Sequence, residues 1–179
     1  MSEPHVRRVL ASDGDRVRSL RLEALSDRAA GIAFLDTYEL AAARPREYWD
    51  DRAVGAALSG GSAQFIAEVG PAWVGTVTIL IPEPGVPDYF GRIPAAGTAL
   101  AVAVYVSPAH RGTGLIDRLF HAGFDWARDQ GARRVHLDVH ADNARARAAY
   151  ARIGFHPTGG TIDGPNGPEV ELSRELGGE

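Results

Sequence analysis

The sequence contains no cysteine and no lysine among its 179 residues. The absence of cysteine excludes disulfide bonds, thiolate nucleophiles and cysteine-ligated zinc. The absence of lysine excludes a Walker-type nucleotide-binding loop, which needs a lysine side chain to reach the outer phosphates. All 19 residues counted as Lys+Arg are therefore arginine. Any chemistry performed by this chain must use other acids, bases and nucleophiles.

The sequence also lacks long apolar runs and an excess of positive charge. Nowhere do about eighteen apolar residues follow one another, and the N-terminal MSEPHVRRVL is too polar for a signal peptide. A formal net charge of -4 gives no attraction to nucleic acid. We therefore expect a cytoplasmic protein with neither nucleic acid nor a membrane as its partner. The length and the 45% hydrophobic content predict a single domain over residues 1–179.

The most informative segment is residues 101–115, AVAVYVSPAHRGTGL, in which an apolar strand stops at a proline and an Arg-Gly-x-Gly turn opens a helix. Glycines let backbone amides approach an anion, and the first N–H groups of a helix lack internal partners. The segment thus indicates a phosphate-bearing ligand. An ordinary tight turn is the alternative. The dinucleotide fingerprint is disfavoured because it needs a third glycine at the first strand of a βαβ unit.

A second segment, HLDVHADNARARAAYARIGF at His136–Phe155, combines a strand with a short alanine-rich helix. Asn143 suits the N-cap of that helix. Tyr150 lies seven residues later, two helical turns away, and so faces the same way. Both side chains can therefore meet one ligand.

Together and in this order, the two segments resemble the signatures of the Gcn5-related N-acetyltransferase (GNAT) family. The family's acyl-CoA motif, Q/R-x-x-G-x-G/A, is occupied by Arg111, Gly112, Thr113, Gly114, Leu115 and Ile116. Ile116 departs from the family's small last residue. The resemblance implies an α/β (α+β) fold with a mixed, mostly antiparallel central sheet flanked by helices on both faces. It also implies acetyl-CoA as co-substrate, no metal, and direct attack by the acceptor amine at a gap between two parallel strands.

The resemblance assigns roles to individual residues. Backbone groups of Val104 and Val106 would pair with the pantetheine arm, the amides from Arg111 to Ile116 would hold the pyrophosphate, and Asn143 would bind the pantetheine side. Tyr150 would protonate the departing thiolate. Complete transfer from a phenol to a thiolate is uphill by roughly 2 kcal/mol, so a strengthening hydrogen bond would suffice. The alternative is that Tyr150 is only a core residue.

The candidate base is Asp138, which alternates with His136 and His140 on one face of its strand. An acidic residue twelve positions before the tyrosine serves as base in the branch of the family that acetylates protein N-termini. Asp138 could instead pair with an arginine such as Arg133 or Arg147. The remaining candidate bases are Glu68 and Asp88.

The sequence therefore predicts an N-acetyltransferase that acts on a primary amine, either a peptide or protein N-terminus or a small molecule. A non-catalytic acyl-CoA-binding sensor or partner module is the alternative. By the resemblance, the acceptor would contact the first helices and the last loop, which offer Phe34, Tyr38, Tyr48, Trp49 and the loop 161–169. The sequence leaves the acceptor and a homodimer undecided.

Turn residues and apolar periodicity place the remaining elements. Strands are expected at residues 6–10, 64–69, 74–81, 135–139, 155–161 and 170–174, beside the central strand before Pro108. Helices are expected after Asp13, over 34–43 with an extension toward Ala57, after Gly114, and over 143–152. Four prolines and three glycines predict a loop over 82–97.

Overall fold

The computed structural model describes residues 3–177, which contain one seven-stranded sheet in the order β1-β2-β3-β4-β5-β7-β6. Only the β4–β5 pair is parallel. The expected mixed, mostly antiparallel sheet is confirmed. The strands are β1 (His5–Arg8), β2 (Ser62–Val69), β3 (Ala72–Leu80), β4 (Thr98–Val106), β5 (Arg134–His140), β6 (His156–Gly164) and β7 (Gly167–Glu175).

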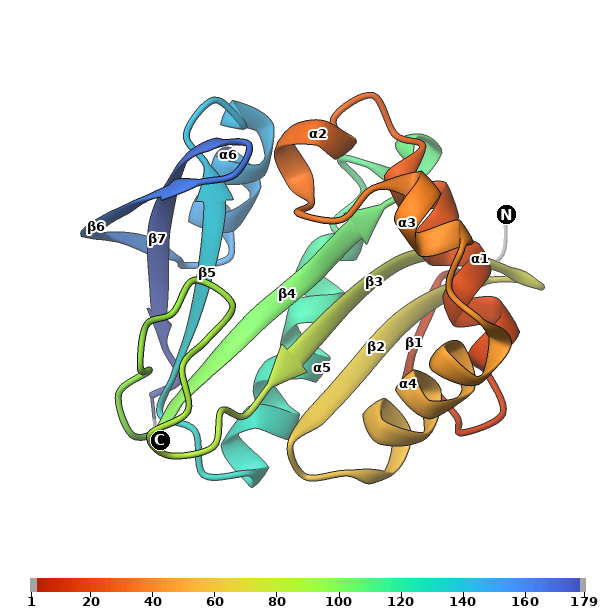
Figure 1. The fold of residues 1–179 in the computed structure, drawn as a ribbon, viewed down its shortest axis with the longest axis horizontal. Coiled ribbons are helices and arrows are strands. Elements are labelled where there is room, and N and C mark those ends of the chain that lie inside the picture. Colours follow the sequence, from red (N-terminus) through yellow and green to blue (C-terminus); the bar gives the residue numbers. More distant parts are fainter. Residues whose placement is uncertain (1–2, 178–179) are drawn as a thin grey trace.

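Helices cover both faces of the sheet (Figure 1). The front face in that view carries α1 (Gly14–Leu25), α3 (Tyr38–Ala42) and α4 (Arg46–Leu58), and α2 (Ala30–Ala33) lies beside the end of β4. The back face carries α5 (Leu115–Asp129) and α6 (Ala144–Arg152), with the 3₁₀ turn η1 (Pro108–His110) before α5. No helix within residues 3–177 is long and apolar enough to cross a membrane.

The helix expected over residues 34–43, with an extension toward Ala57, is instead broken. Over this stretch the structure has two separate helices, α3 and α4, and Pro45 is the N-cap of α4 in an extended conformation. Proline has no N–H to continue a helix and restricts the residue before it. Asp13 does precede α1, but its carboxylate accepts from Leu10 N–H and Arg7 rather than from a helix amide. The loop over 82–97 is confirmed.

The sheet opens between its two parallel strands. Pairing of β4 with β5 covers only Thr98 to Leu100. Farther along, three steps of β4 from Val102 to Tyr105 oppose two steps of β3, which makes a β-bulge around Ala103 at φ +53°. A bulge bends its strand and increases the local twist. As a result, Ala103 and Val104 have no register partner on either neighbouring strand.

Strand β5 divides the side chains between the two faces. Leu137 and Val139 pack in the core with α5 and α6, so Asp138 and His140 point to the front face. Their register partners on β7 are Glu171 and Glu169, which share that face. Acidic and imidazole groups thus gather on the front, beside the gap in the sheet.

Candidate active site

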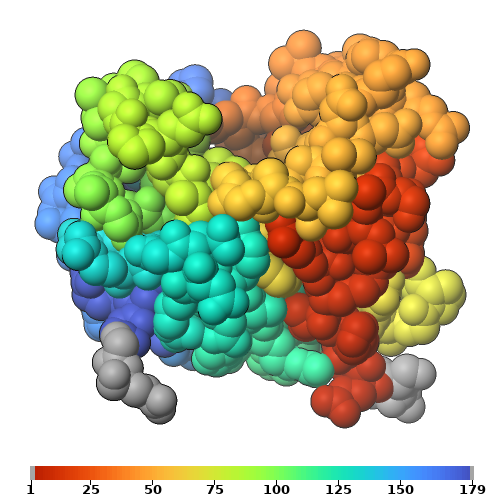
Figure 2. Space-filling model, turned by 90° about the horizontal axis from the view of Figure 1, so that it is seen from below, coloured from red at the N-terminus to blue at the C-terminus, as the bar shows by residue number. Residues whose placement is uncertain are grey.

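A cavity of about 990 Å³ runs through the gap and is lined from both faces of the sheet. Its wall includes β4 and β5, the turn before α5, α6 and α2. On the front face the space-filling view shows a hollow between the 82–97 loop, in yellow-green, and the segment that carries α4, in orange-yellow (Figure 2). Both sides of this hollow contribute to the wall, through Tyr89 and Phe90 on one side and Arg52 on the other.

The glycine turn forms an anion-binding cradle at one end of the cavity. Gly112 and Gly114 adopt φ +76° and +79°, and Gly114 is the N-cap of α5. The backbone N–H groups of residues 112–116 donate to no group among the described residues. Five consecutive free amides at a helix N-terminus attract a negative charge. Ile116 contributes its amide despite its larger side chain.

The side chain of Arg111 holds this turn in place. Its Nε donates to Val106 O at 2.9 Å, and its terminal nitrogen pairs with Asp27 just after α1. Burial alone would raise the pKa of Asp27, but the Ala29 N–H and the Arg111 guanidinium lower it below its usual value. Because Asp27 already neutralises the Arg111 guanidinium, this side chain holds the turn in position. The Arg111 backbone remains beside the cradle.

Asn143 and Tyr150 face the cavity from α6, as their spacing predicts. Asn143 is the N-cap, and its side chain accepts from Ala146 N–H at 3.2 Å. Tyr150 is 8% exposed and packs against Phe120 and Phe155. Within residues 3–177 no hydrogen bond holds its hydroxyl, and burial alone raises its pKa. The phenol therefore stays protonated at neutral pH and is free to donate.

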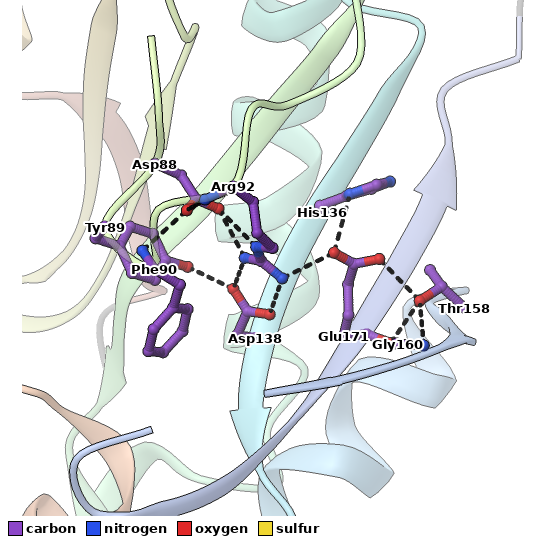
Figure 3. A network of polar contacts seen from close by, with 9 residues as sticks. All are labelled: Asp88, Tyr89, Phe90, Arg92, His136, Asp138, Thr158, Gly160 and Glu171. Atoms are coloured by element: carbon purple, nitrogen blue, oxygen red, sulfur yellow. Dashed lines mark hydrogen bonds and ion pairs between the residues drawn. The ribbon is translucent and has the colours of Figure 1, made fainter. Parts of the chain in front are cut away.

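Asp138 lies in the cavity wall at the centre of an ion-pair network (Figure 3). Arg92 binds both of its oxygens, at 2.9 and 2.6 Å, and Tyr89 donates to it at 2.9 Å. Arg92 also contacts Asp88 at 2.8 Å and Glu171 at 2.9 Å. The base assignment for Asp138 stays a prediction, and this bidentate pair counts against it because the Arg92 guanidinium already occupies both carboxylate oxygens.

The arginine that pairs with Asp138 is neither of those expected. Arg133 donates to Ala96 O and Arg147 donates to Ala141 O. The true partner, Arg92, comes from the 82–97 loop, which no local pattern connects to β5.

The other candidate bases lie outside the cavity wall. Glu68 accepts from Arg7, Arg16 and Trp73, and the Arg7 hydrogen bond is the main reason that its pKa falls to about 2 despite burial. The Asp88 side chain is 2% exposed and bound by Arg92. Neither carboxylate is placed to meet a cavity ligand.

The histidines beside Asp138 are also occupied. Asp142 N–H donates to Nδ1 of His140 at 3.1 Å, so the ring proton belongs on Nε2, which donates to Asn166 O at 3.0 Å. His136 lies 3.8 Å from Glu171, outside the cavity wall. Within residues 3–177 no three His, Cys, Asp or Glu side chains gather as metal ligands.

Sequence reasoning missed several residues of the wall. Glu169 is opposite His140 only through the β5–β7 register, and Arg21 and Arg52 come from helices on the front face. Of the four aromatics expected at the acceptor, Phe34 lines the cavity, Trp49 is a buried core residue, and Tyr38 and Tyr48 lie outside the wall. Residues 161–169, expected as a loop, instead form the ends of β6 and β7 around a short turn, and of these Asn166 and Glu169 line the cavity.

Comparison with solved structures shows the fold. An acetyltransferase of the GNAT family from Streptococcus pneumoniae aligns with a TM-score of 0.75 at 18% identity, over 98% of this chain and all of that one. The structure of yncA from Salmonella typhimurium with its cofactor acetyl-CoA aligns with a TM-score of 0.68 at 18% identity, over 99% and 96%.

Similarity to curated proteins is local. The chain is 50% identical over 52 residues to a mycothiol acetyltransferase of Corynebacterium glutamicum strain R, which covers 29% of this chain and 18% of that protein. It is 41% identical over 56 residues to an uncharacterized N-acetyltransferase of Mycobacterium tuberculosis, over 31% and 36%. The matched segments thus span well under half of these relatives.

The family model described as the acetyltransferase (GNAT) family matches residues 27–155. This range contains both sequence signatures, the glycine cradle and Tyr150, and the whole fold agrees with solved members. The chain belongs to the GNAT family of acetyltransferases.

Proposed function

We propose that this protein transfers an acetyl group from acetyl-CoA to a primary amine by direct attack. The observation that carries the proposal is one continuous cavity that joins five backbone amides to the Tyr150 hydroxyl, all of them free of hydrogen bonds within the described residues. The names of the relatives, mycothiol acetyltransferase and N-acetyltransferase, support acetyl transfer. The acetyl-CoA in the yncA structure supports the donor.

The residues present suit acetyl-CoA along the cavity. Its pyrophosphate would accept hydrogen bonds from the amides of residues 112–116, and Asn143 would meet the pantetheine side. The pantetheine arm would pair with backbone groups at Val104 and Val106, on the edge of β4 that β5 leaves open. The thioester then lies in the gap, where groups from both faces of the sheet can reach it.

The reaction needs one proton removed and one delivered. The ammonium form of the acceptor loses a proton to a base, and the neutral nitrogen attacks the thioester carbon. The C–N bond forms, the C–S bond breaks, and the departing thiolate accepts a hydrogen bond from Tyr150. The amide nitrogen loses its second proton, which reaches the thiolate through solvent. Because burial raises the pKa of Tyr150, the phenol keeps its proton and stabilises the developing thiolate by donating this hydrogen bond.

The acceptor must be neutral to attack. An α-amine near pKa 8 loses its proton at pH 7 for about 1.4 kcal/mol, whereas a lysine-like amine near 10.4 needs nearly 5 kcal/mol. The cavity is also roofed, because Asn166 Nδ2 donates to Phe34 O at 3.0 Å and links the β6–β7 turn to the segment after α2. A peptide N-terminus or a small amine of low pKa suits this site better than a long flexible lysine side chain.

The deciding experiment is release of free thiol from acetyl-CoA in the presence of a panel of amines and N-terminal peptides. Turnover that depends on both substrates, with acetylated product identified by mass spectrometry, is the expected result. Tight binding of acetyl-CoA without transfer to any amine would identify a sensor module instead. Absence of acetyl-CoA binding would remove the proposal altogether.

A further inference from the structure

On the front side of the sheet, the cavity wall contains one carboxylate that has no partner within the described residues. Of the acidic residues there, Asp138 is bound by Arg92, Asp27 by Arg111 and Asp36 by Arg44. Asp117 belongs to the first turn of α5, on the back face. Glu169 is 8% exposed, and within the described residues no side-chain hydrogen bond or ion pair holds it. A buried carboxylate in this state needs a counter-charge.

No arginine is paired with Glu169 within the described residues. Its neighbour across the strand pair is His140, whose ring nitrogens are bonded to the Asp142 N–H and to Asn166 O rather than to Glu169. Asp138 is the other charged neighbour, and Arg92 already neutralises it. Burial raises the pKa of Glu169, and Asp138 adds to this effect, while His140 opposes it. Glu169 is therefore both a stronger base than an exposed glutamate and an attractive site for a cation.

Positive charge is in excess on the helices that cover the same front face. Asp36 receives both nitrogens of Arg44, at 2.8 and 3.2 Å, and reaches Arg21 only at 3.5 Å. Arg52 lines the wall and makes no hydrogen bond or ion pair within the described residues. Burial lowers the pKa of Arg21, and nearby Arg52 lowers it further. The guanidinium groups of Arg21 and Arg52 in the wall thus have little negative charge from the protein beside them.

These two charged ends lie on the acceptor side of the sheet. Glu169 shares the front face with Asp138 and His140, and Arg21 and Arg52 come from α1 and α4, which cover that face. The free amides, Asn143 and Tyr150 belong to α5 and α6 on the back. The remaining arginines of the wall are Arg111, which is paired, and Arg145 and Arg152 on α6. A ligand on the front would therefore meet a negative end and a positive end.

We propose that the acceptor is an amine whose molecule also carries an anionic group, with Glu169 receiving the ammonium and Arg21 and Arg52 receiving the anion. This inference rests on the proposed function. Glu169 takes one proton from the ammonium, which leaves a neutral amine and a neutral carboxyl group. A carboxylate matches a guanidinium in shape and charge, so free amino acids and short peptides with a free C-terminus are the simplest members of this class.

Matched acceptor pairs test the anionic requirement. Each L-amino acid is compared with its amide, and a set of dipeptides is compared with their C-terminal amides, in the thiol-release assay with saturating acetyl-CoA. The expected result is at least a tenfold higher kcat/KM for the free acid of the best pair, after correction for the fraction of neutral amine. Equal or better use of the amides would overturn the inference while leaving acetyl transfer established.

Single-residue variants test the anion-binding end and the ammonium-binding end of the acceptor site separately. Arg52→Gln is expected to raise KM for the free acid at least tenfold and to leave KM for its amide unchanged, because only the acid carries the anion. Glu169→Gln is expected to lower kcat/KM for acid and amide alike by about a hundredfold at pH 7, and by less at pH 9.5, where more amine is neutral. Arg46→Gln, an exposed arginine on the same helix as Arg52, is the matched control.

The acetyl-CoA Kd separates this proposal from its rivals. If Arg52→Gln weakens acetyl-CoA instead of the acid, the positive end belongs to the cofactor and the inference fails. If Glu169→Gln keeps wild-type kcat/KM at both pH values, Glu169 is not the amine site. Binding of acetyl-CoA without transfer to any acceptor would refute the proposed function itself, a result distinct from both.

Discussion

Tyr150 and Asp138 both line the cavity, but they differ in the hydrogen bonds that their side chains make. Among the residues that the structure describes, no group bonds the Tyr150 hydroxyl, whereas both oxygens of Asp138 are bound. We predict that Tyr150→Phe, which keeps the ring packed against Phe120, lowers kcat by about 10²–10⁴-fold. The acetyl-CoA Kd should change little. Stopped-assay rates and calorimetry check both values, with Tyr48→Phe, outside the cavity wall, as control. A near-wild-type kcat would show that Tyr150 only packs.

The prediction for Asp138→Asn follows from its ion pair. Loss of the charge leaves Arg92 with Asp88 and Glu171, so we expect a loss of about 2 kcal/mol in unfolding free energy, below the cost of breaking a fully buried pair. Any fall in kcat/KM should be the same at pH 7 and pH 9.5, because the residue positions the loop. Urea unfolding and rates at both pH values test this. A deficit that shrinks at pH 9.5 would instead make Asp138 the base.

At the scale of elements, the start of α5 is the proposed site of the cofactor pyrophosphate. Gly114 has φ +79°, a conformation that costs a β-branched residue of the order of 1–2 kcal/mol. We predict that Gly114→Val distorts the cradle and raises the acetyl-CoA Kd at least tenfold by calorimetry. Gly70→Val, at φ +57° in the β2–β3 hairpin, brings similar backbone strain far from the cavity and should leave the Kd unchanged. Equal affinities in the two variants would place the cofactor elsewhere.

The elements also show what sequence patterns can and cannot predict. The Arg-Gly-x-Gly turn and the Asn143 N-cap are local features, because their hydrogen bonds and dihedral angles involve neighbouring residues. The partners of Asp138 and the position of Glu169 depend on contacts between residues 46 positions apart and on the β5–β7 register. The break at Pro45 could have been predicted from its missing N–H, whereas the short length of α2 could not.

Over the whole molecule, acid stability should depend on Glu68. Arg7 lowers its folded-state pKa to about 2 from an ordinary 4.5, so the folded protein binds fewer protons at this site than the unfolded chain. The resulting stability is present above pH 4.5 and is lost as the pH falls toward 2. We predict that the stability difference between wild type and Glu68→Gln, measured by urea unfolding, shrinks between pH 6 and pH 3. Glu47→Gln, on the exposed surface, should show no such trend, and a constant difference for Glu68→Gln would contradict the prediction.

In the proposed reaction, the opening between β4 and β5 would give the two substrates separate entrances. The proposed cofactor groups lie on the back of the sheet and the proposed acceptor groups on the front, so neither ligand would have to leave before the other arrives. Steady-state kinetics should therefore give intersecting double-reciprocal lines, the pattern of a ternary complex. Coenzyme A should compete with acetyl-CoA but not with the amine. The acetylated product can depart by the front while coenzyme A remains, and parallel lines would show that the two entrances are not used independently.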